Sequence, residues 1–383
     1  MAVYASGESV PDICERISRG LEPLSEWAKA NGVEFNFAKC GATVLTRKQQ
    51  VPTPVVQFQG KSLTHMPQVK YLGVHLDQKL SWKHHLTELN KRAARKLEYL
   101  LSLCSKVRGP PLDKILLIYK TFVRPLLDYA CPIWDDASVA VKTSLVDSIQ
   151  HHLLARALGV RYKCARGALE VEANVAPLSE RRLFLTARAF KRYSVSRNSV
   201  RQLIEEHRAG TATVLLGTHN ISFILRGDRL CDNSFRSSNT KQSHIARWQR
   251  SWDTNPDGRA FYAIQPVVSL KQSKKFQGLP RYLIAAIVGM RVHQSSLNAD
   301  LNQCALIPSP NCACGQPETV EHYLTGCPNY ASQRAPLQTA VAAAGVTFSA
   351  STILSIGFGT HPSSRQLRKE LLKYIIATRR FSA

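Results

Sequence analysis

The feature that most constrains this chain is a group of three cysteines and one histidine close together in the sequence. Cys312, Cys314, His322 and Cys327 follow the pattern C-x-C-x7-H-x4-C. Three thiolates and one imidazole are a standard tetrahedral zinc set, and one metal would fix the path of the chain that joins them. The H-x4-C half is typical of zinc knuckles, whereas the C-x-C half is tighter than the commoner spacing.

The alternative interpretation is three reduced cysteines beside an unrelated histidine. We favour a structural zinc site, in which Gly315 relieves crowding where the chain wraps the metal. Cys304 is a reserve ligand. The remaining cysteines are scattered, suggest no disulfide framework and are expected to be packing residues in a reducing compartment. They are Cys14, Cys40, Cys104, Cys131, Cys164 and Cys231.

The second constraint is charge. The 383 residues include 51 Lys and Arg against 27 Asp and Glu, a net charge of +24, with an ordinary hydrophobic fraction of 44%. Such an excess attracts polyanions, so we favour nucleic acid as the partner over a basic surface made only for solubility. Half of the excess lies in residues 82–201, which hold 22 basic and 10 acidic side chains.

The sequence shows no sign of a membrane or of secretion. The longest apolar run, residues 282–290, is too short to cross a bilayer. The start of the chain lacks a basic stretch followed by an apolar one, which a secretory signal would need. We therefore expect no membrane partner and a location in the nucleus or cytoplasm.

The spacing of apolar residues predicts an α+β fold that is mainly helical. In residues 1–80 it predicts a strand at Val3 and Tyr4, a helix over 11–31, and strands over 55–58 and 69–76. In the last of these, Leu72, Val74 and Leu76 would share one face. The five expected parts are a small α/β region (1–80), a basic helical region (81–200), a partly flexible connector (201–280), the Cys/His module (281–335) and a C-terminal region with an amphipathic helix through Leu367, Leu371 and Ile375 (336–383).

Residues 81–200 should form four helices. Apolar stripes run over 86–104, 115–126 and 141–153, the third helix ends near Gly159, and a fourth begins after Pro177. If the stripes face a core, the basic side chains between them point outward and can hold phosphates. The candidate nucleic-acid-binding residues are Lys91, Arg92, Arg95, Lys96, Arg181, Arg188 and Arg192.

Three stretches resemble the reverse transcriptases of non-LTR, LINE-type, jockey-like retrotransposons. Residues 24–40 read LSEWAKANGVEFNFAKC, residues 69–85 read VKYLGVHLDQKLSWKHH and residues 119–134 read YKTFVRPLLDYACPIW. In this order they resemble the palm segment after the catalytic aspartates, the primer-grip strand pair leading into the thumb, and the following helical region. The surroundings of Cys314, His322 and Cys327 are similar to the Cys/His module near the C-terminus of these proteins.

The resemblance implies the C-terminal portion of an RNA-directed DNA polymerase. Its partners would be RNA and DNA as primer and template, together with the missing N-terminal half. The family's polymerases hold two Mg²⁺ ions on paired aspartates, which would lie just before Ala2 and therefore outside this sequence. The chain alone is predicted to bind nucleic acid and zinc without polymerising DNA. Lys39 matches a palm lysine that would protonate the leaving pyrophosphate, and the alternative is a surface lysine.

Several alternatives stay open at this stage. Asp135 and Asp136 are adjacent aspartates, which we interpret as a solvated turn between helices rather than a catalytic pair. Trp248 and Trp252 are spaced for one helical face, where they could stack on bases or belong to a core. The alternative function is a non-enzymatic zinc- and nucleic-acid-binding protein, either domesticated or a degenerate transposon remnant. A protein-interaction scaffold is a third possibility.

Overall fold

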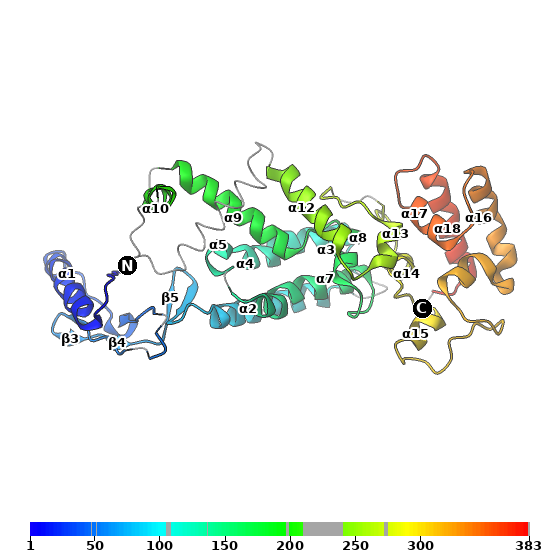
Figure 1. Cartoon of the computed structure of the whole chain (residues 1–383). Helices are drawn as coiled ribbons and strands as arrows, with labels where there is room; N and C mark the ends of the chain where they lie inside the picture. The colour runs from blue at the N-terminus through cyan, green and yellow to red at the C-terminus, as the bar shows by residue number, and fades with distance from the viewer. Residues whose placement is uncertain are drawn as a thin grey trace. The chain divides into compact units, whose positions relative to one another are not determined.

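The chain is mainly helical, with short strands confined to its first eighty residues among those described (Figure 1). The computed structural model describes residues 1–46, 48–50, 52–104, 109–135, 137–196, 199–209, 240–271 and 275–381. The mainly helical character predicted from the sequence is confirmed. The chain divides into two compact units, the first from Met1–Lys91, Asp128–Val146 and Arg182–Ser238, and the second from Arg92–Leu127, Asp147–Arg181 and Asn239–Ala383.

The first unit opens on one long helix, α1 (Val10–Ala30), which begins one residue before the predicted helix. Ser9 caps it by accepting a hydrogen bond from the backbone N–H of Asp12, at 3.5 Å. Its inner face packs in a small core on Val56 and Phe58. The predicted strand at Val3 and Tyr4 is wrong, because no described strand pairs with these exposed residues.

The strands form three separate two-stranded pairs. They are the parallel pair β1 (Gly41–Ala42) with β4 (Thr64–His65), and the antiparallel pairs β2 (Gln57–Phe58) with β3 (Lys61–Ser62) and β5 (Gln68–Tyr71) with β6 (Val74–Asp77). The single strand predicted over 69–76 is wrong. Leu72 and Gly73 have φ of +46° and +82°, the backbone of a two-residue hairpin turn, so the segment folds back on itself. Leu72 is consequently 73% exposed while Val74 is buried.

Helices follow the hairpin. They are α2 (Lys83–Ser102), α3 (Leu112–Ile118), α4 (Arg124–Asp128), α5 (Cys131–Trp134), α6 (Val139–Lys142), α7 (Ser148–Leu158), α8 (Arg166–Glu172) and α9 (Leu178–Val195). The π turns η2 (Tyr119–Val123) and η3 (Thr143–Asp147) continue α3 into α4 and α6 into α7. The four helices predicted between residues 81 and 200 are therefore present, but the short helices α5 and α8 between them were not predicted. Gly159, at φ +76°, ends the third predicted helix as expected.

Eight more helices follow in the described part of the chain. They are α10 (Ser199–Arg208), α12 (Thr240–Thr254), α13 (Arg259–Ile264), α14 (Arg281–Arg291), α15 (Asn298–Asn302), α16 (Ala331–Ala343), α17 (Ala350–Ile356) and α18 (Ser364–Thr378). Trp248 and Trp252 on α12 are 1% and 2% exposed, so they belong to the core and do not present their rings to bases. Cys231 lies outside the described residues. None of the helices in the described residues is long and apolar enough to cross a membrane.

A buried ionic cluster joins three helices of the second unit. Glu172 on α8 is completely buried, and Arg291 on α14 donates to both of its oxygens, at 2.8 and 3.1 Å. Lys275 donates to the same carboxylate, and Arg291 also donates to the carbonyl of Leu354 on α17. Burial alone would raise the pKa of Glu172, but the two cations outweigh it and the pKa lies below its usual value. The carboxylate is therefore charged and fully compensated.

A second buried carboxyl group, Glu170, has no such compensation. It accepts a hydrogen bond from the Gln150 side chain at 2.9 Å, and the Gln150 amide oxygen accepts one from the Tyr119 hydroxyl at 2.8 Å. Burial raises the pKa of Glu170 from 4.5 to about 8, and the bond from Gln150 lowers it only in part. Near neutral pH this carboxyl group is therefore largely protonated.

This raised pKa predicts a specific dependence of stability on pH. The stabilising contribution of Glu170 is complete below pH 4.5 and is lost as pH rises through about 8, because the folded protein must then bury a charge. We expect Glu170→Gln, which stays neutral and can still accept from Gln150, to flatten the decline in unfolding free energy between pH 5 and pH 9. Urea unfolding at several pH values measures this. An unchanged decline in the variant would contradict it.

Candidate metal centre

Two short backbone motifs bring the Cys/His residues together in the second unit. Cys312 and Cys314 lie in a tight turn closed by hydrogen bonds from Cys312 N–H to the Gln316 carbonyl, at 2.7 Å, and from Gly315 N–H to the Cys312 carbonyl, at 2.9 Å. Gly315 has φ +91°, which a side chain would strain, so glycine suits this position. His322 opens the π turn η4 (His322–Gly326), and Cys327 follows that turn and precedes η5 (Pro328–Tyr330).

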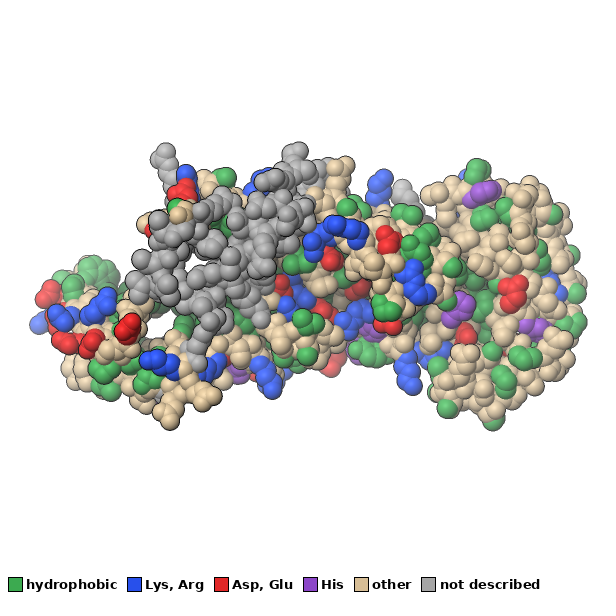
Figure 2. Space-filling view, in the orientation of Figure 1, with side chains coloured by type: hydrophobic (Ala, Val, Ile, Leu, Met, Phe, Trp, Pro, Cys, Tyr) green, Lys and Arg blue, Asp and Glu red, His purple; other side chains and the backbone are tan. Residues whose placement is uncertain are grey.

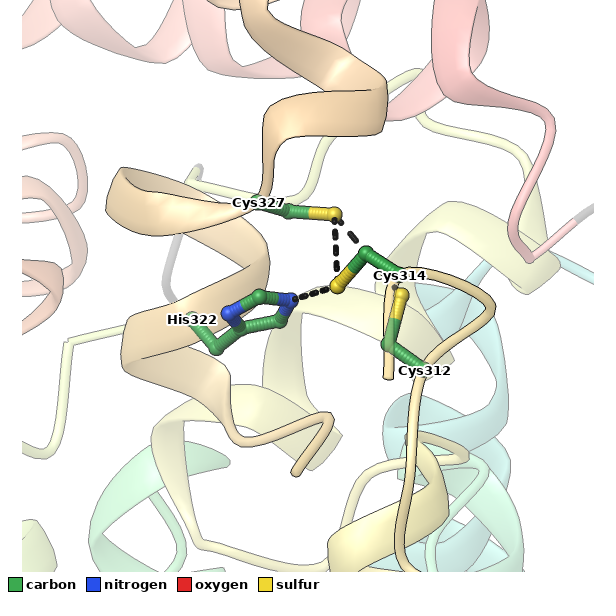
Figure 3. A group of neighbouring side chains, drawn as sticks. All are labelled: Cys312, Cys314, His322 and Cys327. Carbon is green, nitrogen blue, oxygen red and sulfur yellow. Dashed lines mark hydrogen bonds between the residues drawn. The ribbon is translucent and has the colours of Figure 1, made fainter. Parts of the chain in front are cut away.

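The four side chains point toward one another (Figure 3). The Sγ atoms of Cys312 and Cys327 are 3.7 Å apart, those of Cys314 and Cys327 are 4.0 Å apart, and Cys314 Sγ lies 3.2 Å from His322 Nε2. All four possible ligand atoms lie within 4.8 Å of one another. Zn–S bonds of about 2.3 Å in a tetrahedron separate two sulfurs by about 3.8 Å. The group can therefore hold one metal ion, and Cys304 is not part of it.

The centre is closed on one side and accessible on the other. Cys327 and Cys312 are 0% and 7% exposed, whereas Cys314 and His322 are half-buried. Burial raises the pKa of the Cys327 thiol to about 11, while a hydrogen bond from the backbone of Gln316 lowers the pKa of Cys314. A metal ion would have to displace the protons of these thiols, since the thiolate is the ligand form.

A buried arginine contacts the backbone of Cys327, one of the four candidate ligands. Arg334 on α16 is 5% exposed and donates from Nη2 to the Cys327 carbonyl at 2.7 Å. Its Nε and Nη1 are buried without a hydrogen-bond partner, and no ion pair joins it to a carboxylate within the described ranges. A buried cation needs a compensating charge. A divalent metal with three thiolates and a neutral imidazole carries a net charge of −1. A metal-bound centre would therefore supply the negative charge that the buried Arg334 needs.

Sequence reasoning missed Arg334, although a signal was present. Leu337 and Val341 follow it by three and seven residues and are buried on the same helical face. The same holds for Arg182, which follows Leu178 by four residues on α9 and is 4% exposed. A basic residue in an apolar stripe therefore marked a buried cation in both helices.

Arg182 explains the nearby aspartate. Asp135 is 6% exposed and accepts from Arg182 Nε at 2.9 Å and from Lys142 Nζ at 3.1 Å. The interpretation of this position as a solvated turn is wrong for Asp135, because two cations replace the water that would otherwise solvate it. Asp136 lies outside the described residues. Lys39 is exposed at the end of the 3₁₀ helix η1 (Phe37–Lys39).

The predicted phosphate-binding residues differ in exposure. Lys91, Arg92, Arg95, Arg188 and Arg192 are exposed, whereas Lys96 and Arg181 are half-buried. Lys96 Nζ lies 4.0 Å from the Phe122 ring centroid, and the Arg192 guanidinium lies 4.9 Å from that of Tyr193. Lys91, Arg188 and Arg192 belong to the first unit and the other four to the second. Figure 2 shows Lys and Arg scattered over the visible face, interspersed with Asp and Glu.

The surroundings of Arg334 generate a prediction about metal affinity. We expect Arg334→Met to lower it by roughly 10- to 100-fold, because the side chain that balances the bound thiolates is lost. Arg334→Lys, which keeps the charge, should restore part of the affinity. Competition with a chromophoric chelator measures the change, with thermal unfolding in excess metal as the check that the variant folds. Wild-type affinity in the Met variant would contradict the charge-balancing role.

Comparison with known proteins finds relatives that are encoded by mobile elements. No protein-family model and no solved structure matches the chain. The RNA-directed DNA polymerase from mobile element jockey is 26% identical over 186 residues in Drosophila funebris and 24% identical over 216 residues in Drosophila melanogaster, which cover 47% and 56% of this chain. The retrovirus-related Pol polyprotein from type-1 retrotransposable element R1 of Bradysia coprophila is 24% identical over 329 residues, or 83% of this chain.

These alignments cover only part of each relative. The chain spans 20%, 23% and 30% of the length of the three proteins. The resemblance inferred from the sequence is nevertheless confirmed, because relatives of both the jockey and the R1 type match this chain over much of its length. Over much of its length, this chain is therefore a sequence relative of the RNA-directed DNA polymerases of jockey-like and R1-type non-LTR retrotransposons.

Proposed function

We propose that this chain is a zinc-stabilised, nucleic-acid-binding part of a non-LTR retrotransposon reverse transcriptase. The observation that carries the proposal is the convergence of Cys312, Cys314, His322 and Cys327 on one point. It occurs in a chain similar to proteins named as RNA-directed DNA polymerases. Those relatives supply the substrate class, which is RNA and DNA.

Zinc is the metal that best fits this set of donors. Thiolates are soft ligands that select Zn²⁺ over Mg²⁺ or Ca²⁺, which prefer oxygen. Four protein ligands fill a tetrahedron and leave no open position for a substrate, which is the mark of a structural site. Bound zinc would cross-link the turn that carries Cys312 and Cys314 to the turn that carries His322 and Cys327, and so stabilise the module.

The zinc proposal predicts about one zinc per chain. The double variant Cys312→Ser, Cys327→Ser should lose it, because two ligands cannot hold the ion against a chelator. Elemental analysis of the purified protein measures the content. The matched control is Cys40→Ser, Cys304→Ser, which removes two half-buried thiols outside the centre and should keep the zinc. Full zinc in the first variant would rule out this site.

We further propose that residues 1–80 form the remnant of a palm and residues 81–200 a thumb-like region. The hairpin β5–β6 leads directly into α2, as a primer grip leads into a thumb. Tyr71 and Leu72 at its turn are 44% and 73% exposed, so they are available to contact a primer. Residues 201–280 would connect this region to the zinc module in 281–335. Lys39 would be the palm lysine, and the absence of polymerase activity in the isolated chain stays a prediction.

Nucleic acid would be held mainly through its phosphates. On α2, Lys91 is paired with Glu88 at 2.8 Å and Lys96 is bonded to the Phe122 carbonyl. Arg92 and Arg95 are exposed on the same helix, so both can reach a phosphate backbone. Contacts of this kind position a nucleic acid without reading its sequence, and they release counterions.

The phosphate contacts predict a change in salt dependence. Each contact contributes roughly 0.7 to 0.9 to the log–log slope of affinity against salt, so Arg92→Ala, Arg95→Ala should flatten it by about one to two units. Lys96→Ala should have a smaller effect, because its ammonium group already contacts Phe122. Titration of a short primer–template duplex at several salt concentrations measures the slopes. An unchanged slope in the double variant would exclude these two arginines from the interface.

A further inference from the structure

The C-terminal helix α18 has two faces of opposite character. Leu367, Leu371 and Ile375 are buried on its inner face, as the sequence predicted, and the helix packs beside α16 and α17 (Figure 1). The outer face borders a shallow recess of about 800 Å³. Its lining includes the cations Arg365, Arg368, Lys369 and Lys373 and contains no Asp or Glu.

The charge of this outer face is poorly compensated. Glu370 is the acidic residue of the helix, and it is 7% exposed on the inner side, where it pairs with Lys373 at 2.9 Å. Arg365, Arg368 and Lys369 form no ion pair with any residue in the described ranges. Arg365 and Lys369 are exposed and Arg368 is half-buried, so three positive charges lie within five residues, and their mutual repulsion would be relieved by a polyanion.

The metal centre supports this helix directly. Tyr323 follows the candidate ligand His322 in the sequence. Its backbone carbonyl accepts a hydrogen bond from the Tyr374 hydroxyl, and its own hydroxyl forms a hydrogen bond with Thr378 Oγ1 at 2.7 Å. Glu318, in the same loop, accepts two bonds of 2.7 Å from Arg380 just beyond the helix. The loop that carries the four candidate ligands thus holds the C-terminal end of α18, in addition to the packing of this helix on α16 and α17.

We propose that the outer face of α18, built on Arg365, Arg368 and Lys369, is a second binding surface for the phosphate backbone of nucleic acid. The proposal rests on the proposed function in one respect, because the metal centre would hold this surface in position. Arginine matches phosphate geometry with two parallel hydrogen bonds, and the basic residues lie on successive turns about 5.4 Å apart. A membrane fits less well, because Leu367, Leu371 and Ile375 are buried, and the apolar part of the recess is limited to Pro362, half-buried Leu372 and exposed Ile376 beside four cations.

The test uses the full chain and the triple variant Arg365→Gln, Arg368→Gln, Lys369→Gln. Loss of three phosphate contacts should lower the log–log salt slope for a primer–template duplex by about two to three units. The zinc content should not change, since none of the three residues belongs to the Cys/His group, and thermal unfolding checks that the variant, which also alters half-buried Arg368, still folds. The matched control is Arg16→Gln, Arg19→Gln, Lys29→Gln on α1, which removes three exposed cations from a helix that also carries exposed acids and should leave the slope unchanged.

Three results would overturn the surface: a wild-type slope in the triple variant, an equal loss in the α1 control, or wild-type protein that binds anionic phospholipid vesicles at lower concentration than duplex. The metal's role is tested separately by chelation. After chelation the wild-type protein and the triple variant should bind alike, because α18 has lost its support. If the purified protein contains no zinc and the triple variant still has a lower salt slope than the wild type, the zinc proposal and the supporting role of the metal are rejected. The binding surface on α18 is then upheld.

Discussion

The convergence of three thiols and one imidazole is the constraint on which the C-terminal part of the second unit depends. The segment between α15 and α16 contains only single turns of helix and one isolated bridge, Asn311 with Pro317. Within it, the buried apolar side chains of Val320, Tyr323 and Leu324 gather on the His322 side, and the turn that carries Cys312 and Cys314 has little regular structure to hold it. A metal would hold that turn by fixing four points at once. Tyr323 and Glu318 then extend the fixed loop to α18, and the Cys327 carbonyl extends it to Arg334 on α16.

Much of the fold could be predicted because its determinants are local in sequence. Helices α1, α2, α9 and α18 repeat apolar residues every three or four positions, and this spacing alone identifies the buried face. Gly159 marks a helix end for a similar reason, since only its own backbone conformation is involved. The Cys/His group was also visible because the four ligands are close in sequence. A metal site assembled from distant residues would not have been.

The features that escaped prediction depend on tertiary partners or on turn geometry. Leu72 looked like part of one strand because alternation cannot distinguish a continuous strand from a hairpin with a two-residue turn. Asp135 looked solvated because its partner Arg182 lies 47 residues away. The sequence did not indicate the partner of Arg334, since this side chain contacts the Cys327 carbonyl, which comes from another segment of the chain. Helical spacing could have located both arginines in the core, but it could not have named their partners.

The buried cluster around Glu172 also determines the order in which the second unit can assemble. Its principal partner, Arg291, lies 119 residues further along the chain. Burying Glu172 in its charged form costs free energy until a cation accompanies it, so the final packing of α8 is expected after the intervening residues have been synthesised. During that interval the apolar residues beside it, Leu169 and Val171, have no finished core to enter. The apolar residues of α8 therefore stay exposed for longer during synthesis than those of a helix whose charged partners lie nearby in the sequence.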